Sequence, residues 1–174
     1  VRGHLESLAA RLIAQSTERE EACNKLQNVI DEIERLINIG KINDQTCKDM
    51  QQYNATFHQT ILEGCGHDFV GFTCNRLNHL PMLEVGSMAF DQTTIKTKIG
   101  MERTFFRLRL GNAQHKVICE AIKTGDSVRA EGMMREHSNT MIEYIELFEK
   151  RHDELSLTDL ISYSGFNLAT ETPN

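Results

Sequence analysis

Apolar residues recur every three or four positions through most of this chain, which is the spacing of one face of an α-helix. No segment alternates between apolar and polar residues convincingly enough to predict a strand. The pattern therefore predicts an all-α fold, a single antiparallel bundle of about six or seven helices.

The first helix is expected from the start of the chain to about Gln15. Its apolar stripe consists of Val1, Leu5, Leu8, Leu12 and Ile13. No N-cap residue or initiator Met precedes Val1, so we expect a further segment upstream.

The next two helices are marked by their capping residues. A capping box formed by Thr17 and Glu20 predicts the start of the second helix, and Gly40 predicts its end. Asn43 or Asp44 is expected to cap the third helix.

Three further helices complete the predicted bundle. The fourth begins near Asp68 and is interrupted around Pro81. A fifth is expected over roughly 95–124 and a sixth from Ser127 to about His152, with the sequence "TGD" between them ending one helix and capping the next.

The inward stripe of the third helix contains two polar residues, Asn54 and His58. The complete stripe is Cys47, Met50, Asn54, Phe57, His58 and Ile61. Burying an amide and an imidazole in an apolar face costs free energy unless each finds a partner.

Two other histidines lie on inward stripes. His115 shares the face of the fifth helix with Leu108 and Ile118, and His137 shares that of the sixth with Met134. A single histidine on such a face is more often a satisfied core residue than a ligand. Three of them on three helices of one bundle, with Asn54 one turn before the first, predict a site for a divalent ion such as Zn²⁺, Ni²⁺ or Mn²⁺.

Composition and charge narrow the class of protein. The chain has 174 residues, 40% of them hydrophobic, which suits one soluble domain with a substantial core. No apolar run is long enough to span a membrane. With 25 acidic and 19 basic residues the net charge is −6, which makes this chain a poor candidate for binding nucleic acid itself. The five cysteines show no CxxC spacing and are expected to be reduced thiols in a cytoplasmic protein.

Three segments of the chain share residue types and spacing with one known family of domains. The segment "VRGHLESLAARLIAQ" at the start of the chain resembles the first helix of the C-terminal effector-binding (FCD-type) domain of FadR-subfamily, GntR-family bacterial transcription regulators. Its D-x-x-x-F-H segment resembles "NATFHQTILEGCGHDFV", which begins at Asn54. Its H-x-x-I-x-x-A-I-x-x-G-D-x-x-x-A-x-x-x-M-x-x-H segment resembles "HKVICEAIKTGDSVRAEGMMREH", which runs from His115 to His137.

The resemblance implies a metal site, since metal-binding members of the family hold an ion with one Asp and three His. Those roles fall on Asn54, His58, His115 and His137, and the departure from the family pattern is Asn in place of Asp. An amide oxygen is a poorer ligand than a carboxylate but does not forbid coordination. Some members bind larger effectors without a metal, so that alternative stays open.

The resemblance also implies a dimerising, effector-sensing domain over residues 1–152, followed by a C-terminal tail over 153–174. The homodimer would contact DNA only through an N-terminal winged helix-turn-helix domain, which this chain lacks. Its effector is expected to be a small carboxylate metabolite that binds an open position on the metal.

A buried carboxylate effector needs a cationic partner, and four arginines are candidates. Arg2 is the best placed, because it shares an inward stripe with Ala9 and Ile13, although a solvated helix-end charge is an equally reasonable interpretation. The register of the other helices is not fixed by the pattern, so the weaker candidates are Arg76, Arg103 and Arg107.

Two other classes of protein compete with the regulator. The first alternative is a helical-bundle metalloenzyme that uses the His-rich site to activate water, but no inward Asp or Glu is evident near the histidines to act as a general base. A structural adaptor is the second alternative, and it would not explain why three histidines face inward. We therefore expect a non-enzymatic sensor domain.

Overall fold

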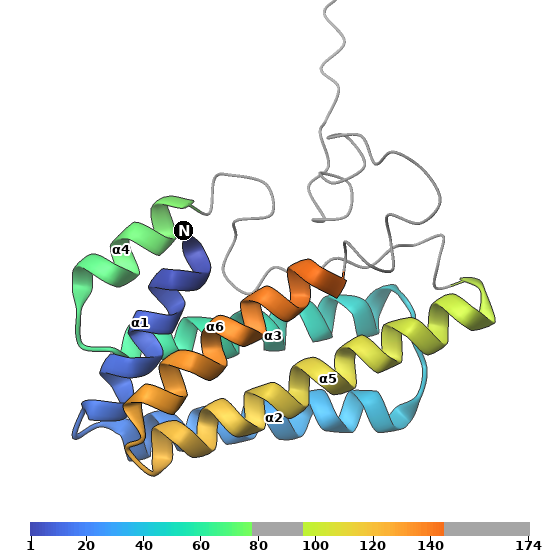
Figure 1. Ribbon diagram of the computed structural model, residues 1–174. Coiled ribbons are helices and arrows are strands. Elements are labelled where there is room, and N and C mark those ends of the chain that lie inside the picture. The colour runs from blue at the N-terminus through green and yellow to red at the C-terminus, as the bar shows by residue number, and fades with distance from the viewer. Residues whose placement is uncertain (78–95, 145–174) are drawn as a thin grey trace, which may run out of the picture.

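The computed structural model describes residues 1–77 and 96–144, with side chains described as far as residue 140. These residues form six α-helices and no strand (Figure 1), which confirms the predicted all-α bundle. The helices are α1 (Arg2–Gln15), α2 (Arg19–Ile39), α3 (Asp44–Gly64), α4 (Asp68–Leu77), α5 (Lys98–Lys123) and α6 (Ser127–Tyr144).

Several helix boundaries follow the predicted capping residues. The side chain of Asn43 accepts a hydrogen bond from the backbone N–H of Thr46 at 2.9 Å, and the backbone N–H of Asn43 donates to the hydroxyl of Thr46 at 2.7 Å. Gly40 ends α2 with a φ of 68°, a left-handed conformation that glycine adopts without strain. Asp126 caps α6 by accepting a hydrogen bond from the N–H of Arg129 at 3.1 Å.

Two predicted helix starts are wrong. The N-cap of α2 is Glu18, which makes no capping bond through its side chain, so the expected Thr17–Glu20 capping box does not form. Helix α5 begins at Lys98 rather than near residue 95, because the hydroxyl of Thr97 accepts the N–H of Gly100 and caps the helix there. Apolar periodicity identifies the face of a helix but not the residue at which it begins.

Other expectations concern residues outside the described ranges. The interruption around Pro81, the end of the sixth helix near His152 and the tail over 153–174 all lie there. The domain boundary at residue 152 therefore stays a prediction.

The core receives side chains from all six helices, and α4 adds Val70 and Cys74 to it where it packs against α1 and α3. Figure 1 shows α1 alongside α6, and α5 in front of α2. The largest fully buried side chains include Phe57 of α3, Ile118 and His115 of α5, and Met134 of α6. This arrangement brings the inward faces of α3, α5 and α6 together.

The buried face of α1 differs from the predicted apolar stripe. Val1 is 87% exposed and Leu8 is 39% exposed, whereas Arg2 and Glu6 are buried. The complete buried set is Arg2, Glu6, Ser7, Ala9, Ala10, Ile13 and Ala14. Small residues predominate in this set, which lets α1 approach its neighbours closely with that face. The rest of the predicted stripe is inward, since Ile13 is buried and Leu5 and Leu12 pack against the core.

The five cysteines are buried and form no disulfide, in agreement with the expected free thiols. Within the described part of the chain, none of the helices combines the length and apolar character that crossing a bilayer requires.

Candidate metal centre

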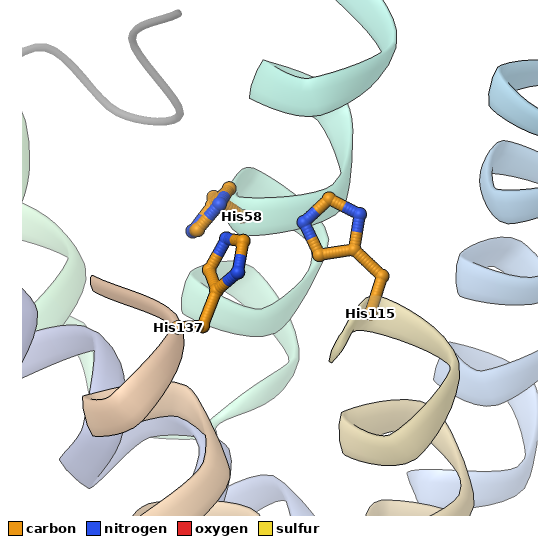
Figure 2. Close-up of side chains that lie close together, drawn as sticks. All are labelled: His58, His115 and His137. Atoms are coloured by element: carbon orange, nitrogen blue, oxygen red, sulfur yellow. The ribbon is translucent and has the colours of Figure 1, made fainter. Parts of the chain in front are cut away.

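His58, His115 and His137 converge from α3, α5 and α6, with their rings turned toward one another (Figure 2). One ring nitrogen of each lies within 4.8 Å of one from each of the others. The ring centroids are 5.7 Å apart for His58 and His115, 5.3 Å for His58 and His137, and 4.7 Å for His115 and His137. The predicted convergence of the three inward histidines is therefore confirmed.

These separations suit a single divalent ion. Nitrogen ligands about 2.1 Å from one ion, at angles of about 90–110°, lie about 3.0–3.5 Å from one another. Since the nitrogens are within 4.8 Å of one another, the rings would need to close by at most about 2 Å. Rotation of the imidazoles about their side-chain torsions supplies movements of that size.

His115 is the histidine whose environment most needs a further partner. It is 2% exposed, and among the described residues neither Nδ1 nor Nε2 has a hydrogen-bond partner. Its ring stacks on Phe57, with centroids 3.9 Å apart. Burial, followed by the proximity of His137 and His58, holds the pKa of His115 well below its usual value. The ring is therefore a neutral imidazole, the form that binds metals.

His137 is also held neutral, but it has a hydrogen-bond partner. Burial and the neighbouring His58 lower the pKa of His137 to about 3, although Glu6 acts in the opposite direction. Its Nδ1 lies 2.9 Å from Oε1 of Gln114, which precedes His115 on α5.

His58 contacts a buried carboxylate that the sequence interpretation missed. Its Nδ1 lies 3.1 Å from Oε2 of Glu6, and Glu6 is 3% exposed. The other carboxylate oxygen, Oε1, lies 3.6 Å from Nη1 of Arg2. The expectation that no inward acidic residue lies near the histidines is therefore wrong.

Glu6 is ionised in this setting. Burial raises the pKa of its carboxyl group, but the charge and hydrogen bond of His58, with further contributions from Arg2 and His137, outweigh burial and lower it overall. A carboxylate with two cationic or donor neighbours is stable at such a depth.

Glu6 could have been found from the sequence, because it lies four residues after Arg2 and three before Ala9 on the same inward stripe. The stripe predicted from the leucines of the first helix does not include Glu6. Gln114 carried no comparable signal, since a glutamine beside an inward histidine usually points to solvent.

Asn54 is 5% exposed and lies one turn before His58, so its inward position is confirmed. Coordination by its side-chain oxygen stays a prediction.

The four candidate arginines have different surroundings. Arg2 is 8% exposed, and its Nη2 donates to the carbonyl of Cys74 on α4 at 3.2 Å. Its predicted inward orientation is thus confirmed.

Of the weaker candidates, Arg107 is buried on α5, with 7% of its surface exposed. The side chains of Arg76 and Arg103 are exposed, and Arg76 lies over the ring of Phe72. Effector binding by any of the four stays a prediction.

A helical bundle in which three buried histidines converge belongs to the class of α-domains that could hold a metal ion in the core. The sequence profile of the FCD domain family matches residues 1–140, a range that contains all three histidines. The chain belongs to the FCD domain family, which is consistent with the C-terminal effector-binding domain of FadR-type, GntR-family regulators. No curated protein gives a significant match to the chain.

Proposed function

We propose that this chain is the metal-dependent sensor and dimerisation domain of a cytoplasmic GntR-family transcription regulator. His58, His115 and His137 would hold a divalent ion, Zn²⁺, Ni²⁺ or Mn²⁺, with Asn54 as a fourth, weaker ligand. The observation that carries the proposal is the pair of buried ring nitrogens on His115, for which the described part of the chain offers no hydrogen-bond partner. A metal ion would use one of these nitrogens and offset the cost of burying it.

The charges around the site favour an anionic effector. Arg2 and Glu6 carry opposite charges and lie side by side, so they nearly cancel, and the low pKa values of His115 and His137 keep those rings neutral. A bound divalent ion would therefore retain most of its +2 charge in the core, which is unfavourable without an accompanying anion. A small carboxylate metabolite on the open face of the ion would provide it.

Arg2 is the cationic residue that we propose as the second partner of this carboxylate. It is buried, and it reaches the histidine cluster through its contact with Glu6. An effector that binds one arrangement of the bundle better than another would shift how two attached DNA-binding domains are spaced. This is how the domain would regulate binding to an operator.

A water-activating metalloenzyme is a weaker proposal, even though a carboxylate lies near the histidines. Glu6 directs one oxygen to Nδ1 of His58 and the other toward Arg2. A general base instead needs an oxygen free to take a proton from the reacting water. The contacts of Glu6 therefore support a role in holding the site.

The metal proposal is tested by measuring metal content and thermal unfolding of the wild type and of His115→Leu. The wild type should carry about one ion per chain. Chelation should lower its Tm, since an ion present at about 100 times its Kd adds about 2.7 kcal/mol of stability. His115→Leu should retain no ion, and chelator should leave its Tm unchanged.

Stability in the absence of metal separates a ligand from an ordinary core histidine. Because a buried unpaired polar group costs about 1–3 kcal/mol, metal-free His115→Leu should be at least as stable as the metal-free wild type. The exposed His67 provides the control, and His67→Leu should retain the ion. A wild type that binds no divalent ion, or an H115L variant that still binds one, would overturn the proposal.

A further inference from the structure

Two of the three site histidines are each held by a chain of hydrogen bonds or ion pairs that ends on a backbone carbonyl. A carbonyl oxygen can only accept a hydrogen bond. The donor and acceptor at every earlier step of such a chain can therefore be assigned from its end.

The first chain supports His137 and joins α5 to α6. The hydroxyl of Thr140 donates to the carbonyl of Glu136 at 2.8 Å, so its oxygen is left to accept from Nε2 of Gln114 at 3.0 Å. Oε1 of Gln114 must then accept from Nδ1 of His137 at 2.9 Å. The single proton of the neutral ring is on Nδ1, and the lone pair is on Nε2.

The second chain supports His58 and joins α1, α3 and α4. Arg2 donates from Nη2 to the carbonyl of Cys74 at 3.2 Å and places Nη1 3.6 Å from Oε1 of Glu6. Oε2 of Glu6 can only accept, so Nδ1 of His58 donates to it at 3.1 Å. A neutral His58 again has its lone pair on Nε2.

We propose that these two hydrogen-bond chains set the tautomers of His58 and His137 already in the metal-free protein, with Glu6 and Gln114 as the positioning residues. This inference rests on the proposed function in one respect, that the lone pairs serve a metal. The tautomers themselves can be measured without metal. His115 has no such support and is the ligand free to use either nitrogen.

The two supports differ in strength. Glu6 is a carboxylate, which makes the imidazole it accepts from a more basic ligand, whereas Gln114 is a neutral amide. Loss of the charge on Glu6 should therefore weaken metal binding more than loss of the Thr140 hydroxyl.

The first experiment measures tautomers in metal-free protein by long-range ¹H–¹⁵N NMR of the histidine rings. His58 and His137 should both appear as the Nδ1–H form. Thr140→Val should allow the Gln114 amide group to flip, so that its oxygen and nitrogen exchange positions. His137 alone should then become a mixture of tautomers. Thr60 is a matched control, since its hydroxyl also donates to the carbonyl four residues earlier but reaches no histidine, and Thr60→Val should change neither ring. An Nε2–H form at either His58 or His137 in the wild type would refute the inference.

The second experiment measures affinity for Zn²⁺ by competition with a chelator. Glu6→Gln keeps an acceptor but removes the charge, and it should weaken binding about 10–100-fold. Thr140→Val should weaken it less, Gln114→Glu should strengthen it, and Thr60→Val should leave it unchanged. Far-UV circular dichroism verifies that each variant is folded.

The outcomes distinguish this inference from the proposed function. If the wild type binds no metal, the proposed function fails while the NMR result still tests the tautomers. If the wild type binds Zn²⁺ and E6Q and Q114E bind it equally well, the positioning role is wrong and the metal site stands.

Discussion

At the scale of single residues, Asn54 would decide how much negative charge the protein itself places at the proposed ion. Glu6 provides a carboxylate nearby, but Arg2 balances it, so the proposed ligand set would remain neutral. Asn54→Asp should strengthen metal retention about tenfold or more, equivalent to about 1.4 kcal/mol, and should weaken binding of a carboxylate effector. The physical reason is that the protein would then supply the neutralising charge that the effector otherwise brings. Calorimetric titration of both forms with a panel of sugar acids and hydroxy acids measures the effect. Asn24→Asp, at an exposed position of α2, adds the same charge away from the site and should change neither affinity. Tighter effector binding by N54D, or a preference for neutral ligands, would contradict the charge argument.

At the scale of helices, α1 packs closely against α6, and on α1 the buried Glu6 contacts His58 of α3. A Cβ atom added at Gly3 would lie 2.9 Å from Cβ of Ser138 on α6, closer than two side chains pack. Gly3→Ala should therefore push the helices apart and destabilise the fold by about 1–3 kcal/mol. Gly132 is the matched control, because nothing lies within 4 Å of a Cβ added there. Gly132→Ala should stabilise the fold by about 0.5–1 kcal/mol through helix propensity alone. Urea unfolding of the three proteins compares them, and equal effects of the two substitutions would show that the α1–α6 contact is not tight.

At the scale of the whole molecule, the prediction concerns assembly. A regulator that reads a pseudo-palindromic site needs two-fold symmetry, and the family resemblance implies that this domain provides it. Light scattering of the chain at micromolar concentration should therefore give about twice its mass of 19.9 kDa. Removal of the metal should leave this mass unchanged, because the histidines lie in the core of one chain. A strictly monomeric chain would mean that dimerisation depends on another part of the regulator.

The sequence by itself determined the fold class, the cap at Asp126 and the inward position of Asn54, His58, His115 and His137, and it narrowed the cap of α3 to Asn43 or Asp44. These follow from helical periodicity and local turn chemistry, which act over a few residues. The matching segments also identified the family, because residue type and spacing carry that signal directly.

Only the tertiary structure decided what the histidines contact. Periodicity tells which side of a helix is buried, but the distance between side chains on different helices depends on how far each helix is rotated and how closely it packs. Helix α1 is rotated about its axis so that Glu6 rather than Leu8 is buried, and the small residues on the buried face permit this rotation. The contact of Gln114 with His137 likewise exists only because α5 and α6 lie side by side. Which residues lie on the inward faces is thus a local property of the chain, whereas the residues that orient His58 and His137 are selected by packing between helices.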